Sequence, residues 1–196
     1  MNNVVLAGTA VSAPEFSHKI YGEKFYRFLL DIARKSGTHD IIPCVASEVY
    51  ADFESGSEIK VIGEVRTQNF YSGGKRHLDI FVHVQEMLDY DGYDENIVEI
   101  EGYICKEPTY RETPYGRTIS DFICASNRGH GKSDYIPCIT WGRNALRASK
   151  LDAGTKITAN GRLQSREYEK NIGDETVVKT AYELSIATLG IADDED

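Results

Sequence analysis

Aromatic and basic side chains occur close together in the second half of the chain, in runs that we expect to be strands. The aromatic members are Tyr135, Trp141 and Tyr168. The cations within a few residues of them are Arg128, Lys132, Arg143 and Arg166. Aromatic faces stack on unpaired nucleic-acid bases, at about 1–3 kcal/mol per base, while cations hold the phosphates. The pattern therefore favours binding of a single strand, with burial of the rings in a barrel core as the alternative.

Other reactive residue types form no catalytic or metal-binding pattern. No G-x-S-x-G motif is present, and metal spacing is absent among the histidines, which are His18, His39, His77, His83 and His130. The segment 129–133 ends like a phosphate-binding loop, but Ser126 stands where that motif needs glycine, and Pro137 follows where it needs a helix. Cys44 and Cys138 lie in apolar runs, which favours a core role over a nucleophile. We expect no enzyme and no cofactor.

Composition and charge narrow the protein class. The chain has 196 residues, 41% of them hydrophobic and 27% charged, which is enough for one large domain or two small ones. No apolar run is long enough to span a membrane, the N-terminus does not resemble a secretory signal, and the four cysteines are far apart. We therefore expect a cytoplasmic, nucleoid-associated protein without a membrane partner. The net charge of −9 divides into −5 for residues 1–94, 0 for 95–192 and −4 for 193–196, so the second half can present a basic face.

The chain contains an internal repeat. A shift of 94 residues makes 13 of the 48 positions from 4 to 51 identical, against roughly three expected by chance. The matches include Gly8 with Gly102 and the tripeptide Ile-Pro-Cys at 42–44 and 136–138. After a four-residue insertion, Gly63 aligns with Gly161. Two tandem domains are predicted, at 1–94 and 95–192, followed by a short acidic tail at 193–196.

Each repeat reads as an all-β unit. Five strand-like runs are interrupted by one short helix between the third and fourth, at 48–54 in one repeat and 143–151 in the other. The glycines at 63 and 161 interrupt the long fourth run, as expected for a bulge or barrel bend. Five strands with one helix between strands 3 and 4 are typical of an OB-fold barrel, so we predict two such barrels in tandem.

The second repeat resembles the bacterial single-stranded DNA-binding proteins. The similarity lies in TPYG at 113–116, DFICASNR at 121–128, DYIPCITWG at 134–142 and NGRLQSREY at 160–168, and residues 1–8 resemble the start of the family. The resemblance implies base stacking at His130, Tyr135, Trp141 and Tyr168. The same positions in the first repeat are Ser36, Ile41, Ser47 and Phe70, so only Phe70, beside Tyr71, is retained as an aromatic residue. The expected binding residues are therefore Tyr135, Trp141, Tyr168, His130, Arg128, Lys132, Arg143, Arg162, Arg166, Phe70 and Tyr71.

The leading interpretation is sequence-tolerant binding and protection of single-stranded DNA in replication, recombination or repair, mainly by the second domain. The first domain has lost most of the stacking set and is expected to act as a scaffold. The alternative is an OB-fold protein-interaction or accessory replication or mobile-element module with weak nucleic-acid binding.

The family resemblance also implies four OB domains, which predicts a homodimer whose first strands, beginning at Val4 and Val98, pair across chains. The rival is a monomer in which the two repeats pair with each other. The acidic tail is shorter than in the family and lacks its apolar end, although replication or recombination proteins are expected partners.

Overall fold

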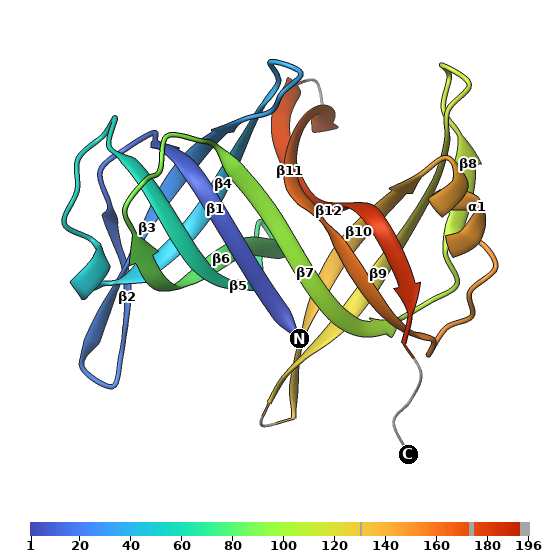
Figure 1. The fold of residues 1–196 in the computed structure, drawn as a ribbon, viewed down its shortest axis with the longest axis horizontal. Helices are drawn as coiled ribbons and strands as arrows, with labels where there is room; N and C mark the ends of the chain where they lie inside the picture. Colours follow the sequence, from blue (N-terminus) through green and yellow to red (C-terminus); the bar gives the residue numbers. More distant parts are fainter. Residues whose placement is uncertain (130, 173–174, 193–196) are drawn as a thin grey trace.

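The computed structural model describes residues 1–129, 131–172 and 175–192, and this part of the chain is folded almost entirely as β-strands (Figure 1). The first half contains β1 (Asn2–Ala10), β2 (Glu15–Ile20), β3 (Glu23–Ala33), β4 (His39–Ser47), the 3-10 turn η1 (Glu48–Tyr50), β5 (Glu58–Ser72) and β6 (Lys75–Leu88). The second half contains β7 (Glu95–Ile104), β8 (Thr109–Glu112), β9 (Thr118–Gly129), β10 (Lys132–Trp141), α1 (Arg143–Ala148), β11 (Lys156–Ile172) and β12 (Glu175–Ile191).

Both halves close into barrels with the same topology. In the first, β1 pairs with both β3 and β5, and β4 runs parallel to β6. In the second, β7 pairs with both β9 and β11, and β10 runs parallel to β12. In each barrel the last strand thus closes the sheet by running parallel to β4 or β10. This closure is that of an OB-fold, as the sequence predicts.

Glycines make the barrel closure sterically allowed. A Cβ on Gly8 would collide with the backbone carbonyl of Asp31, and one on Gly102 would collide with that of Ala125. Gly63 and Gly161 likewise lie against the carbonyls of His83 and Ser185, at register shifts in β5 and β11. The predicted bulges at these two glycines are confirmed.

Two details of the prediction are wrong. Each barrel has a short sixth strand, since β2 and β8 form hairpins on β3 and β9 where only a turn had been expected. The first barrel also has only the three-residue turn η1 in place of the predicted helix at 48–54. The four extra residues of the second repeat allow α1 to bury Ala145 and Ala148, whereas in the first repeat Phe53 packs edge-on against Phe28, with 4.9 Å between ring centroids.

The cores of the two barrels consist of alternate residues of these strands. Cys44, Cys124 and Cys138 are buried among aliphatic side chains. Burial raises the pKa of Cys44 and of Cys124 to about 12, which keeps both thiols protonated at neutral pH. The predicted core role of Cys44 and Cys138 is confirmed.

The first strands of the two barrels pair with each other within the chain. β1 and β7 are antiparallel, with Val4 opposite Val98, so the repeats are related by a local two-fold axis and form one continuous sheet (Figure 1). Asn2 donates to and accepts from the backbone of Val65, and Asn96 does the same with Leu163. The prediction that these strands pair across chains is therefore wrong, because both edges are already occupied.

Two buried aspartates hold the barrels together on either side of this axis. Asp40 on β4 accepts from Arg34 and from the backbone N–H of Ser165 on β11, at 3.1 Å. Asp134 on β10 accepts from the backbone N–H of Thr67 on β5, at 2.7 Å, and pairs with Arg66 and Arg128. A buried carboxylate is tolerated only when its oxygens are hydrogen-bonded, so each aspartate requires the opposite barrel in place. We call these two sites the junction clamps.

Candidate nucleic-acid interface

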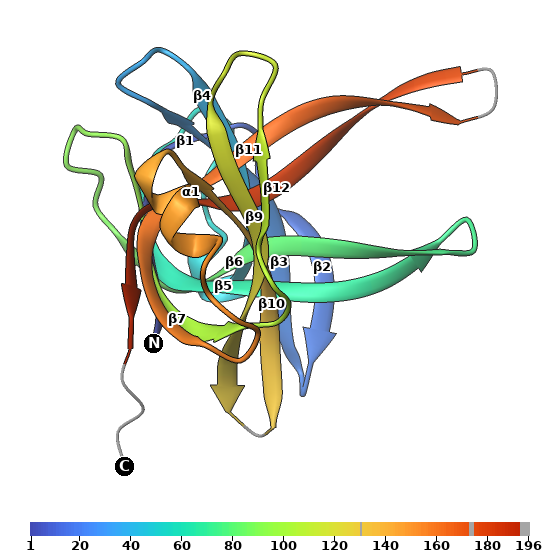
Figure 2. The same ribbon diagram turned by 90° about the vertical axis from the view of Figure 1, so that its right-hand side faces the viewer.

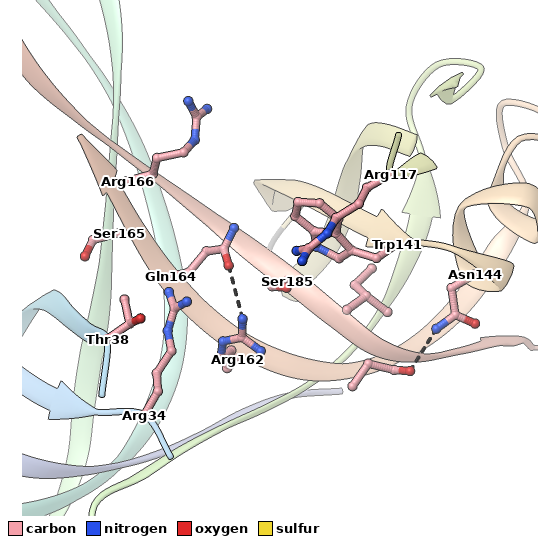
Figure 3. A pocket seen from close by; sticks show the side chains of 12 residues that line it. Arg34, Thr38, Arg117, Trp141, Asn144, Arg162, Gln164, Ser165, Arg166 and Ser185 are labelled. Carbon is pink, nitrogen blue, oxygen red and sulfur yellow. Dashed lines mark hydrogen bonds between the residues drawn. The ribbon is translucent and has the colours of Figure 1, made fainter. Parts of the chain in front are cut away.

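A groove of about 710 Å³ lies at the junction of the two barrels, mainly over β10, β11 and β12 (Figure 3). We call it the cationic groove, because its walls carry four arginines and none of its lining residues is acidic. The lining residues that matter for binding are Arg34, Arg117, Trp141, Arg162, Gln164 and Arg166. Trp141 is therefore an exposed wall residue rather than part of the barrel core, with 39% of its surface accessible.

Strand periodicity places the cations of β11 in a row. Successive side chains of a strand point to opposite faces, so Arg162, Gln164 and Arg166 share one face while Leu163 points into the core. Tyr168 follows on the same face, pairs with Lys179 of β12, and is 39% exposed. The row therefore continues from the groove onto the β11–β12 hairpin. This hairpin projects toward the same side of the molecule as the β5–β6 hairpin (Figure 2).

Trp141 is positioned by the end of β10. It pairs with Ile119 of β9, and the chain then turns at Gly142, whose φ of +56° favours glycine, before α1 begins at Arg143. Buried Thr140 fixes this end of the strand by donating to the carbonyl of Ser120 at 3.2 Å. The indole is thus held on a rigid strand end.

The charges of the groove are only partly compensated. Arg34 is paired with Asp40, and Arg166 lies 3.8 Å from Glu183, which also accepts from Gln164 at 2.6 Å. Arg162 has a single long hydrogen bond, 3.5 Å to Gln164. Burial lowers the pKa of Arg162, and the neighbouring Arg34 lowers it further, against the opposing effect of Asp40. Cations in such a partly buried wall are suited to hold an anion.

The structure separates the predicted binding residues. Trp141, Arg162 and Arg166 line the cationic groove, and Tyr168 lies on the same strand face beyond it. Tyr135 is exposed, but its N–H donates to Thr67, which places it at the other junction clamp. Lys132 and Arg143 are exposed and do not line the groove. His130 lies outside the residues that the structure describes.

Arg128 has a structural role that the sequence did not reveal. Its guanidinium lies 3.5 Å from Asp134, so it is part of a junction clamp and lines a different pocket from Trp141. Its repeat partner Arg34 forms the corresponding ion pair with Asp40. The identities of Arg34 with Arg128 and of Asp40 with Asp134 therefore reflect how the barrels join.

The predicted aromatic residues of the first barrel lie far out on the β5–β6 hairpin. Phe70 stacks on His77, with 5.3 Å between the ring centroids, and Tyr71 is exposed beside it. Neither lines the cationic groove.

A smaller pocket of about 250 Å³ in the first barrel contains aromatic residues that the repeat alignment missed. The rings of His18 and Phe25 are stacked, with 5.0 Å between their centroids. The ring of His83 also contacts Phe25, in a tilted arrangement with 5.9 Å between the centroids. Phe81 lines the same pocket, and the Arg27 guanidinium lies 5.7 Å from the centre of its ring. We call this the aromatic pocket. Its aromatic residues stand at positions that carry no ring in the second repeat, so alignment with Tyr135, Trp141 and Tyr168 could not reveal it.

Two members of the cationic groove were also missed from sequence. Arg117 lies at the start of the β9 hairpin, and Arg34 comes from the other barrel. Both are distant in sequence from Trp141, and only the folded chain brings them to it.

Other kinds of site find no support in the described residues. Within residues 1–129, 131–172 and 175–192, no cluster of three or more His, Cys, Asp or Glu side chains could hold a metal ion. None of the helices in this part of the chain is long and apolar enough to cross a membrane.

Comparison with known proteins identifies relatives of the second half. The model of the family described as "Single-strand binding protein family" matches residues 95–191. Single-stranded DNA-binding protein A of Bacillus subtilis is 35% identical over 101 residues, covering 48% of this chain and 59% of that protein. Single-stranded DNA-binding protein 2 of Listeria innocua is 32% identical over 101 residues, covering 48% of this chain and 64% of that protein. The match thus spans less than two thirds of these relatives.

A solved structure resembles the whole chain. The crystal structure of wild-type single-stranded DNA binding protein from Thermus aquaticus superposes with a TM-score of 0.79 and 20% identity, covering 100% of this chain and 95% of that one. At this identity the likeness supports the fold of both barrels in tandem. Residues 95–191 thus match the single-strand binding protein family, and the solved structure shows that the two-barrel fold extends over the whole chain.

Proposed function

We propose that the chain is a non-enzymatic protein that binds single-stranded DNA, tolerates different sequences, and protects the strand during replication, recombination or repair. The observation that carries the proposal is the cationic groove, in which exposed Trp141 stands among four arginines with no acidic lining residue. The net charge of the chain is −9, so this concentration of cations is local.

The second domain supplies most of the binding in this proposal. Bases stack on Trp141 and on Tyr168 along β11, with Tyr135 beyond the groove. Phosphates are held by the arginines of the groove, while Lys132 and Arg143 extend the cationic surface beyond it. These contacts read base faces and phosphates rather than base edges, so they do not discriminate sequence. The first domain acts chiefly as a scaffold through the junction clamps.

Titration with oligo-dT tests the proposal. Trp141 is the single tryptophan, so stacking of a base should quench the intrinsic fluorescence of the protein. The slope of log affinity against log salt should be about −0.7 for each phosphate neutralised. Salt-independent binding, or binding confined to one sequence, would contradict the proposal. It would favour the alternative, a protein-interaction or accessory replication module.

We further propose that two chains form a homodimer presenting four OB domains, acting in the cytoplasm at the nucleoid with replication or recombination proteins. Since β1 and β7 are paired within the chain, such a dimer must use other surfaces. Light scattering should give about 44 kDa, twice the 21.9 kDa of one chain. A mass equal to that of one chain would support the self-paired monomer.

A further inference from the structure

We propose that Arg34 of the first barrel and Arg162 of the second together bind one backbone phosphate of a single strand lying in the cationic groove. This inference rests on the proposed function, which it deepens by making the first barrel a direct part of the binding site. The ligand group is a phosphodiester, recognised by two guanidinium groups from different domains.

Both arginines face the same space. Arg34 follows β3 and Arg162 lies on β11, yet both line the cationic groove. Both also line the adjoining pocket of about 450 Å³, whose walls include Asp40 and Asp94, so the phosphate is placed on the groove side. Figure 3 shows the two guanidinium groups on the same side of the groove, with Gln164 between them and Arg166. The Arg34 guanidinium is held in place by Asp40, whose other contact is the backbone N–H of Ser165.

Arg162 lacks the anion that a guanidinium in this environment normally has. No carboxylate forms an ion pair with it in the described part of the chain, and its one hydrogen bond is the 3.5 Å contact with Gln164. Its Nε is buried without any hydrogen-bond partner in the same part of the chain. Arg34 places a second positive charge near Arg162. A phosphate at this point would therefore offset the repulsion between the two guanidinium groups and the partial desolvation of Arg162.

The other side of the local two-fold axis indicates that this excess of charge is not needed for folding. The position equivalent to Arg162 is Glu64, which pairs with Arg66. The position equivalent to Arg34 is Arg128, which is held by Asp134. The same backbone junction therefore forms there with an internal carboxylate, whereas Arg162 has no such carboxylate partner among the described residues.

The test compares Arg162→Gln with the unchanged full-length chain, using fluorescein-labelled oligo-dT across a range of salt concentrations. We expect about tenfold weaker binding at 0.1 M salt, as a charge-assisted contact is lost. The salt slope should become shallower by about 0.7, the value for one phosphate. Arg162→Lys should keep the salt slope, because the charge is kept. Lys60→Gln is the matched control, since it removes the same charge from an ion pair with Asp91 and Glu95 outside the groove.

A second set of variants tests the sharing of the phosphate. Arg34→Gln alone would leave Asp40 buried and unpaired, so it is combined with Asp40→Asn, and urea unfolding checks that the pair is folded. This pair should also reduce the slope by about 0.7, and adding Arg162→Gln should reduce it no further. A total reduction of the salt slope by about 1.4 would show two separate phosphates and overturn the shared site.

If Arg162→Gln behaves like Lys60→Gln while the unchanged chain binds oligo-dT, this inference fails and the proposed function stands. If the unchanged chain does not bind, the proposed function fails.

Discussion

The cationic groove and the aromatic pocket occupy equivalent places on the two sides of the local two-fold axis, yet they differ in size and chemistry. The first measures about 710 Å³ and the second about 250 Å³. The register of the sheet aligns Arg162 with Glu64 and Ser185 with His83. The repeat alignment pairs Trp141 with Ser47. Small or cationic residues thus leave one junction open and positive, while histidine, phenylalanine and an internal ion pair fill the other.

The clamps beneath these two surfaces are nearly the same. Each has a fully buried aspartate, an arginine of its own barrel, and a backbone N–H of the opposite barrel. The duplicated residues therefore build the junction, and the residues that differ between the repeats decide what each surface can bind.

The largest expected effect is on the clamps. Asp134→Ala and Asp40→Ala should each lower the free energy of unfolding by about 3 kcal/mol, because each leaves buried donors without an acceptor. Urea denaturation measures both, and Asp121→Ala, at an exposed ion pair with Arg111, is the control. A loss confined to one aspartate would show that the two clamps are not equivalent.

The next largest effect is on oligo-dT binding, and it distinguishes the cationic groove from the equivalent surface of the first barrel. Trp141→Ala should weaken oligo-dT binding by about 1–3 kcal/mol, since one stacking surface is removed. Ser47→Ala, at the equivalent position, should leave binding within about twofold. Anisotropy of a labelled oligonucleotide is the measurement, because the variant has no tryptophan.

Tyr168 and Phe70 stand at equivalent positions on the two projecting hairpins, so their alanine variants form a matched pair. Tyr168→Ala should cost about 1–3 kcal/mol of binding, and Phe70→Ala less, because Phe70 is already stacked on His77 and lies beyond the aromatic pocket rather than beside a cationic row. Equal losses for the two variants would contradict the dominance of the second domain.

A smaller effect is expected from the internal ion pair of the first barrel. Glu64→Gln removes the carboxylate that pairs with Arg66, so the aromatic pocket gains positive character. Binding to oligo-dT should tighten about two- to threefold at low salt, a gain within the range of a surface ion pair. Unchanged or weaker binding would indicate that the first barrel takes no part near this pocket.

The smallest effect concerns pH. Burial, together with nearby Arg66, lowers the pKa of His83, so the folded state disfavours the protonated ring. The unfolded chain then binds more protons near the ordinary histidine pKa, and stability should fall as pH decreases below about 6.5. His83→Gln should reduce that loss, measured as melting temperature between pH 7.5 and 5.5. The same pH dependence in both proteins would exclude His83 as its source.

Much of the architecture could be predicted from the sequence. The 94-residue repeat, the alternation within strands and the glycines at 63 and 161 predict two barrels with bulges at those points, because these features act through local backbone geometry. The stacking positions Trp141 and Tyr168 followed from the family resemblance, and the structure shows that both rings are exposed. The missing helix at 48–54 depended on whether four extra residues were available to complete it.

The sequence alone determined that the chain repeats, that each repeat forms an OB barrel, and that rings and cations concentrate in the second half. Only the tertiary structure decided which of them share a surface. Pairing of Val4 with Val98 brings Arg34 to Arg162 and Thr67 to Asp134. Each of these contacts joins a residue of one barrel to a residue of the other. Local pattern carries no information on them, because they depend on how one barrel packs against the other.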